Sequence, residues 1–184
     1  MLIHYGHNTA EVDSHGGLVK IDNEHYEIHE GELFTSAVVS ASAASGTNIN
    51  ILMSAHSGEA SHMVFAVVFD GPVLASLFES VTLSATGPTR TAITAYNRNR
   101  TSSNAASLPL SAGGNLTANG TTLISMQLGG INYNPGTIAR FGGSTRGESE
   151  WVLDPTKSYT FQVKSLAANT SVSVALEWYE HDTE

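Results

Sequence analysis

The stretch Ser171-Val172-Ser173-Val174-Ala175-Leu176-Glu177-Trp178-Tyr179-Glu180 decides the fold class, because apolar residues alternate with small or polar ones along its whole length. Successive side chains of a β-strand point to opposite faces, so one face carries Val172, Val174, Leu176 and Trp178. An edge strand with this much apolar surface would promote aggregation. We therefore expect this strand to pair inside a sheet, which would anchor this end of the domain.

A second strong strand is expected at residues 61–70, where both faces are apolar. One face carries Met63, Phe65, Val67 and Phe69, and the other carries Val64, Ala66 and Val68. A strand that is apolar on both faces must be covered on both faces. In a two-layer sandwich only one face meets the other sheet, so we expect a loop, the N-terminal arm or another subunit to cover the second.

Further short strands are expected at residues 18–21, 25–29, 33–40, 47–54, 89–95 and 159–163, separated by turn residues. Residues 74–83 fit a strand slightly better than a single helix, and the long polar stretch 97–119 is expected to be functional or flexible. The pattern predicts an all-β fold, a jelly-roll-like β-sandwich over residues 18–184. Residues 1–17, rich in His, Gly and Asn, are expected to form an irregular N-terminal arm.

The composition excludes several classes of protein. A net charge of −9 with only 8 Lys and Arg argues against nucleic-acid binding, which needs a basic surface. No run of about 18 apolar residues is present, so we expect no membrane-spanning helix. There is no cysteine, and the first residues do not resemble a signal peptide, so we expect synthesis in the cytoplasm.

A metal site is one interpretation of His25, Glu27 and His29. If residues 25–29 form a strand, these three side chains share a face, and two imidazoles with a carboxylate suit iron or zinc. A cupin-like metal enzyme would use such a cluster. The alternative, a polar strand face with Tyr26 and Ile28 turned to the core, is the commoner case, so we expect no metal or other cofactor.

Two further groups of residues are candidates for a partner interface. Arg98 and Arg100 would point the same way on an extended segment and form a cationic fork for an acidic partner, or else bridge to acids of the same chain. His4, Tyr5 and His7 lie in the N-terminal arm, which would become ordered by binding a partner. No nucleophile elbow, phosphate loop or dinucleotide fingerprint is present, and we expect no enzymatic activity.

Three stretches together carry a resemblance: residues 26–31 (YEIHEG), 97–100 (NRNR) and 177–181 (EWYEH). In this order and at about this separation they resemble the small jelly-roll head decoration (cement) proteins of tailed bacteriophages. The resemblance spans roughly residues 20–181 and implies no catalytic residues.

The resemblance implies a virion structural protein on the outer capsid surface, made in the host cytoplasm. Such a protein would form a homotrimer and brace the major capsid protein of a phage head. An alternative is a carbohydrate- or host-recognition module of a tail or fibre, in which exposed Tyr and Trp residues would stack on sugars. The cupin-like metal enzyme is less favoured than either.

Overall fold

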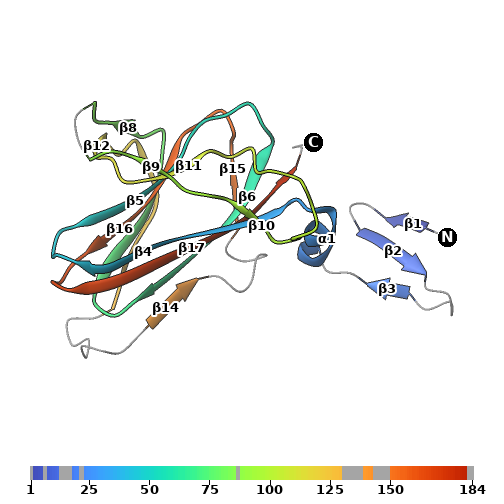
Figure 1. Cartoon of the computed structure of the whole chain (residues 1–184), viewed down its shortest axis with the longest axis horizontal. Helices are drawn as coiled ribbons and strands as arrows, with labels where there is room; N and C mark the ends of the chain where they lie inside the picture. The colour runs from blue at the N-terminus through green and yellow to red at the C-terminus, as the bar shows by residue number, and fades with distance from the viewer. Residues whose placement is uncertain are drawn as a thin grey trace.

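Two antiparallel sheets packed face to face make up most of the protein (Figure 1). The computed structural model describes the backbone of residues 2–5, 8–12, 18–20, 23–85, 88–129, 139–142 and 150–181. Side chains are described for residues 25–85, 88–129 and 150–181. All structural statements below concern these residues.

The first sheet runs in the order β10-β4-β17-β6-β14, and β15 also pairs with β6. Its strands are β4 (Leu33–Ala43), β6 (Ala60–Phe69), β10 (Tyr96–Asn97), β14 (Ala139–Gly142), β15 (Trp151–Leu153) and β17 (Thr170–His181). The second sheet runs in the order β13-β7-β16-β5-β11-β9. Its strands are β5 (Asn48–Met53), β7 (Val73–Glu79), β9 (Thr91–Ala92), β11 (Leu110–Ala112), β13 (Thr121–Leu128) and β16 (Tyr159–Ser165). A separate pair joins β8 (Thr82–Leu83) to β12 (Leu116–Ala118).

The strand order is that of a jelly roll. Along the chain, the strands β4, β5, β6, β7, β13, β14 with β15, β16 and β17 form the frame of the sandwich. One sheet contains β4-β17-β6-β14 and the other contains β5-β16-β7-β13. Consecutive strands therefore alternate between the two sheets, except β7 and β13, and the first and last lie side by side, as in a jelly roll. The predicted all-β sandwich is confirmed.

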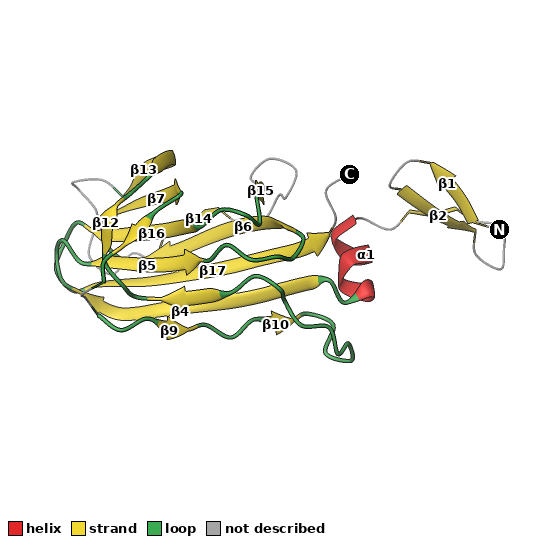
Figure 2. Cartoon of the chain, turned by 90° about the horizontal axis from the view of Figure 1, so that it is seen from above, coloured by secondary structure: helices red, strands yellow, loops and turns green. Residues whose placement is uncertain are grey.

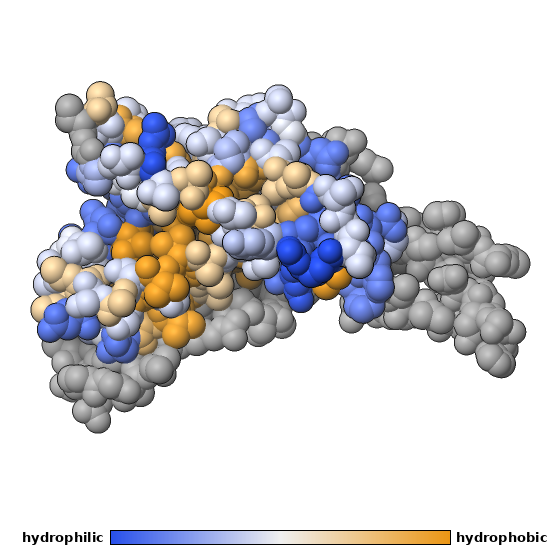
Figure 3. Space-filling view, in the orientation of Figure 1, coloured by the Kyte–Doolittle hydropathy of each residue, from blue (hydrophilic) through white to orange (hydrophobic). Residues whose placement is uncertain are grey.

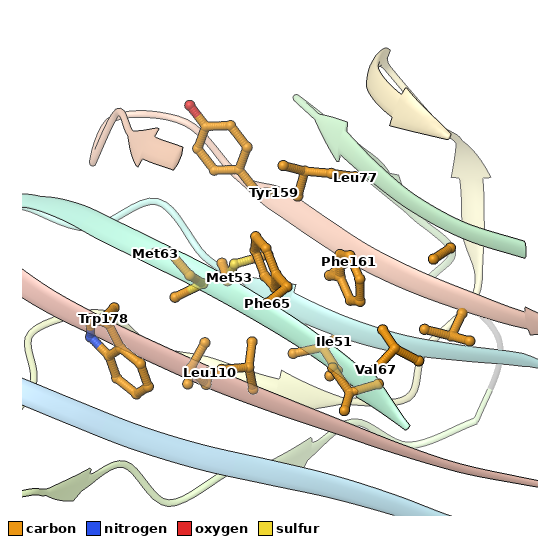
Figure 4. Close-up of a cluster of buried hydrophobic side chains, with 14 of the residues drawn as sticks. Ile51, Met53, Met63, Phe65, Val67, Leu77, Leu110, Tyr159, Phe161 and Trp178 are labelled. Atoms are coloured by element: carbon orange, nitrogen blue, oxygen red, sulfur yellow. The ribbon is translucent and has the colours of Figure 1, made fainter. Parts of the chain in front are cut away.

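The core lies between the sheets and is built from the inward faces of the long strands. The alternation predicted for β17 is confirmed, because Val172, Val174, Leu176 and Trp178 are all buried. This strand pairs with β4 on one side and β6 on the other. Across the two layers Phe65 and Phe161 stack with their ring centroids 4.4 Å apart (Figure 4).

The second apolar face of β6 is largely covered within the single chain. Val64 and Ala66 are 5% and 7% exposed, and Val68 is partly exposed. Burying both faces of a strand this apolar is what the hydrophobic effect favours. The sequence left three possible coverings for this face: a loop, the N-terminal arm or another subunit. Val64 and Ala66 do not require another subunit, because they are already buried within the single chain.

The expected strand at residues 25–29 is wrong, because these residues belong to an α-helix, α1 (Asn23–Glu30). The helix ends in a Schellman motif: Gly31 has φ +79°, its N–H bonds Ile28 O, and Glu32 N bonds Glu27 O. Glycine is the residue that enters this left-handed conformation most easily. Gly31 after Glu30 is the signal in the sequence that a helix ends here, and it was not used when a strand was predicted.

The expectation of an irregular arm over residues 1–17 is wrong for the residues that the structure describes there, because they form two short strands. The strand expected at residues 18–21 is confirmed at Leu18–Lys20. β1 (Leu2–Tyr5), β2 (Asn8–Val12) and β3 (Leu18–Lys20) form a small antiparallel sheet. Figures 1 and 2 place it beyond α1, at one end of the sandwich. Strands of four and five residues, as in the first two, are too short to give a sustained alternation in a sequence rich in Gly and His.

The structure also shows what two regions form that the sequence described less clearly. Residues 73–79 are the strand β7, as slightly favoured over a helix. The polar stretch 97–119 is only partly a loop, because it also contains β11 and β12. Its remaining long connection, residues 98–109, crosses the end of the sandwich beside α1 (Figure 1).

Candidate partner-binding surface

The loop 98–109 is fixed to the end of α1 by asparagine side chains. The last carbonyls of a helix lack partners inside the helix. Here the Nδ2 groups of Asn99, Asn104 and Asn97 donate to the carbonyl oxygens of residues 29, 30 and 31 at 3.1, 3.3 and 2.6 Å. The stretches 26–31 and 97–100, far apart in sequence, therefore meet at this end of the sandwich.

The predicted arginine fork does not form. After β10 the chain turns, because Asn97 Oδ1 accepts from Asn99 N and Asn99 Oδ1 accepts from Thr101 N. Arg98 forms an ion pair with Glu177 of β17 at 2.6 Å, whereas Arg100 donates to Asn97 O at 3.5 Å. The sequence allowed Arg98 either to face an acidic partner or to pair with an acid of the same chain, and the structure shows the second. It also brings the stretch 177–181 to the other two.

Glu180 of β17 forms a second attachment for the same loop. Its carboxylate is 5% exposed and accepts three hydrogen bonds, from Ser107 N at 2.7 Å, Leu108 N at 3.1 Å and Trp178 Nε1 at 2.9 Å. A buried carboxylate is tolerated only when its oxygens are satisfied in this way. The loop is thereby tied to β17 as well as to α1.

Glu32, between α1 and β4, lies under the same loop. Partial burial raises the pKa of the Glu32 carboxyl, and the negative charge of Glu59 raises it further. The hydrogen bond from Asn104 Nδ2 at 2.8 Å acts in the opposite direction. Ionisation of the Glu32 carboxyl therefore destabilises the folded state.

An unpaired strand edge lies next to this loop. β10 pairs with β4 only at Phe34 and Thr35, so in the described part of the chain residues 36–43 have no strand partner on that side. Strand N–H groups alternate in direction, and Leu33 O bonds Arg98 N on the open side, so the N–H of Val39 also points there. The side chain of Val39 is 69% exposed.

A shallow groove separates this edge from the segment 92–94. Its volume is about 540 Å³, and small and apolar residues line most of it, among them Val38, Ala92 and Ile93. Tyr96, which is 53% exposed, lies at its border. Figure 3 shows hydrophobic residues gathered on this face of the sandwich, over the region of β4 and β9. We call residues 36–43 together with this groove the β4 edge surface.

The three candidate metal ligands do not share a face, because α1 is a helix. Residues four apart lie together on a helix and residues two apart do not. His25 and His29 accordingly meet with their Nε2 atoms 3.0 Å apart, while Glu27 projects elsewhere. Within the described residues no three His, Asp or Glu side chains are placed to hold one metal ion.

A stack of aromatic rings that the sequence did not predict lies where β6 pairs with β17. The ring centroid of His62 lies 4.6 Å from that of Tyr179 and 4.5 Å from that of His181, and His62 Nδ1 lies 3.2 Å from Glu150 Oε1. The β6–β17 register opposes Tyr179 to His62. Only the pairing register brings these residues together, so no local sequence signal could have found the cluster.

The remaining sequence candidates are placed as follows. His4 and Tyr5 lie in β1, opposite Thr9 and Asn8 of β2, and His7 lies outside the described residues. Trp178 is fully buried, so its indole is not available to stack on a sugar, and Trp151 is partly buried where it packs against the core.

The described residues include no helix long and apolar enough to cross a membrane. Compared with known proteins, the sequence matches no family model, and no curated protein is significantly similar to it.

Proposed function

We propose that this protein is a capsid decoration (cement) protein, which binds the outside of a bacteriophage head through the β4 edge surface and contacts the major capsid protein there. The proposal also includes self-association as a homotrimer. It needs neither a cofactor nor a catalytic site. The N-terminal residues, including His4, Tyr5 and His7, would form a second contact with the shell.

The observation that carries this proposal is the unpaired edge of β4. An exposed strand edge offers a row of free N–H and C=O groups, which an extended segment of another protein can complete. Residues 36–43 contain no charged residue and no proline, the features that usually protect an edge. In a chain of net charge −9, such a neutral and apolar strip suits a protein partner.

The surrounding loop supports the same interpretation. Asn97, Asn99, Asn104 and the buried Glu180 hold the loop 98–109 in one position where it leaves β10, the strand that pairs with the start of β4. A surface whose main chain is already fixed loses little conformational entropy on binding. The three stretches that resemble decoration proteins also converge at this end, which favours a shared role for them.

The test is binding to phage heads that lack their decoration protein. The variant Val39→Lys places a charge on the β4 edge, and Val152→Lys makes the same change at a site that is 56% exposed on β15, away from that edge. We expect Val39→Lys to reduce co-sedimentation with heads at least about tenfold, because an edge lysine blocks strand addition. The Val152→Lys variant should bind like the unmodified protein.

The outcome is interpreted only after the melting temperatures of both variants match that of the unmodified protein. Equal binding by both variants would refute the role of the β4 edge. Failure of the unmodified protein to bind any head, or immunogold labelling of the tail rather than the head, would refute the decoration function itself.

A further inference from the structure

A row of hydrogen-bonding side chains crosses the outer face of the second sheet. Ser125 of β13 opposes Ser76 of β7, Ser76 opposes Gln162 of β16, and Gln162 opposes Asn50 of β5. The two hydroxyls lie 2.8 Å apart, and Gln162 Nε2 donates to Asn50 Oδ1 at 2.8 Å. The row therefore forms an ordered polar floor four strands wide.

The floor lies in a groove rather than on an open face. The groove has a volume of about 760 Å³, and the connection around β12 forms one wall through Asn115, Leu116 and Asn119. Asn50 fastens this wall, since its Nδ2 donates to Gly114 O at 2.7 Å and its carbonyl accepts from Gly113 N at 3.0 Å. Asn50 and Ser76 are buried beneath it.

Much of the groove's hydrogen-bonding capacity is unused. Gln162 Oε1 accepts no hydrogen bond from any described residue, and the side-chain amides of Asn48, Asn115 and Asn119 have no described partner. Of the two paired hydroxyls, one donates to the other, so the second has a hydrogen left to give. Amides and hydroxyls that both donate and accept match the vicinal hydroxyls of a sugar.

The charge in the groove differs from that of the rest of the protein. None of the described residues lining it is acidic, although the chain has 17 Asp and Glu against 8 Lys and Arg. Its one charged residue, Lys164, is half-buried beside the polar row, opposite Asn48 and Leu74, and forms no ion pair with a described residue. A half-buried ammonium group beside free amides favours a ligand that carries a negative charge.

We propose that this groove binds a saccharide chain that carries a carboxylate. The sugar hydroxyls bond the amides of Gln162, Asn48 and Asn115, and the carboxylate lies against the Lys164 ammonium group. The site is separate from the β4 edge surface, so a decoration protein could bind the shell and a saccharide at the same time. No covalent chemistry is involved.

Titration calorimetry with the isolated full-length protein tests the proposal. The probes are tetragalacturonate, the neutral galactotetraose, and citrate as a carboxylate without sugar rings. We expect tetragalacturonate to bind with a Kd of about 1 mM or tighter, and galactotetraose and citrate at least about tenfold more weakly.

Two variants and a matched control locate the site. Gln162→Leu keeps the side-chain volume but removes the amide, and Lys164→Gln removes the charge; each should weaken tetragalacturonate binding about tenfold. Lys157→Gln removes a cation that is paired with Glu79 outside the groove and should leave binding unchanged.

The proposal is overturned if tetragalacturonate does not bind at about 10 mM. It is also overturned if citrate or galactotetraose binds equally well, or if the Lys157 control weakens binding as much as the groove variants. Because Gln162→Leu alters the bond to Asn50, its melting temperature is compared first. If that variant is unfolded, Ser125→Ala, which changes an exposed hydroxyl of the same row, replaces it.

Discussion

Glu180 joins the loop 98–109 to β17 through the backbone N–H groups of Ser107 and Leu108. In Glu180→Gln one of the two acceptor oxygens becomes an NH₂ group, which would face a backbone or indole N–H donor. Leaving buried donors unsatisfied costs about 1–3 kcal/mol. We expect the free energy of unfolding to fall by that amount in urea denaturation, with faster hydrogen exchange at the Ser107 and Leu108 amides.

Glu177→Gln is the control for this change, since it also replaces a carboxylate of β17, but one whose side chain is only partly buried. Its ion pair with Arg98 should contribute no more than about 1 kcal/mol, because solvent screens exposed pairs. If the two variants lose equal stability, the three hydrogen bonds to Glu180 do not carry the stabilisation assigned to them.

Glu32 gives a prediction about pH. Because burial raises the pKa of its carboxyl, the folded protein holds this proton more tightly than the unfolded chain does. The contribution of Glu32 to stability is therefore favourable at low pH and is lost as the pH rises through the raised pKa. Glu32→Gln keeps an oxygen acceptor for Asn104 and removes the charge, so it should be more stable at pH 7 by up to about 0.5 kcal/mol.

Thermal melts of the two proteins across pH check this expectation. The advantage of Glu32→Gln should vanish below about pH 4, where the unmodified carboxyl is protonated as well. An advantage that persists at lower pH would mean that the charge of Glu32 is not its cause.

At the scale of elements, the end of α1 depends on Gly31. Both Gly31 and Gly46 have positive φ, at +79° and +84°, but a Cβ on Gly31 would collide with Ser102 whereas one on Gly46 would meet nothing within 4 Å. Each Gly→Ala change should cost about 1–2 kcal/mol for the left-handed backbone. Gly31→Ala should cost at least about 1 kcal/mol more, for the displaced loop.

The added change Ser102→Gly distinguishes the two contributions. It should recover the extra loss in Gly31→Ala and have no such effect in Gly46→Ala, as measured by denaturant unfolding. Equal losses in the two single variants would show that the loop moves aside without cost, and that α1 and the loop are not firmly joined.

The sequence predicted the long strands best, and β17 and β6 have ten or more residues each. Alternation fixes which face of β17 is buried. β6 is apolar on both faces, so its length and composition predict a strand but not its orientation. α1 was missed because its His and Glu residues fit a polar strand face as well as a short helix. The strands β1 and β2 were missed because four or five residues give too little pattern, whereas the strand expected at residues 18–21 is confirmed as β3.

The residues of the candidate sites could be predicted less well than the fold, because their neighbours come from pairing between distant strands. Arg98 was singled out from the sequence, but its partner Glu177 is 79 residues away and is brought near by β10, β4 and β17. The row from Ser125 to Asn50 likewise exists only in the register of four strands. Alternation predicts which face a side chain takes, but it contains no information on which strand lies next to it.

At the scale of the whole molecule, the N-terminal sheet and the sandwich should be separable. Among the residues whose side chains the structure describes, those of the core cluster all lie at position 34 or later, and both large sheets lie within residues 33–181. Deletion of residues 1–22 removes β1, β2 and β3 together, whereas deletion of residues 1–17 alone would leave β3 without β2. We expect the shorter chain to fold with an unchanged melting temperature, because every strand of both large sheets is kept.

Binding to heads is the property that this deletion should change. If the N-terminal sheet forms the second contact with the shell, the truncated protein loses one of two linked contacts, and multivalent binding weakens far more than either contact alone would suggest. Co-sedimentation should then drop while the melting temperature stays constant. Full occupancy of heads by the truncated protein would assign the whole contact to the β4 edge surface, and a lower melting temperature would mean that the N-terminal sheet belongs to the folded body after all.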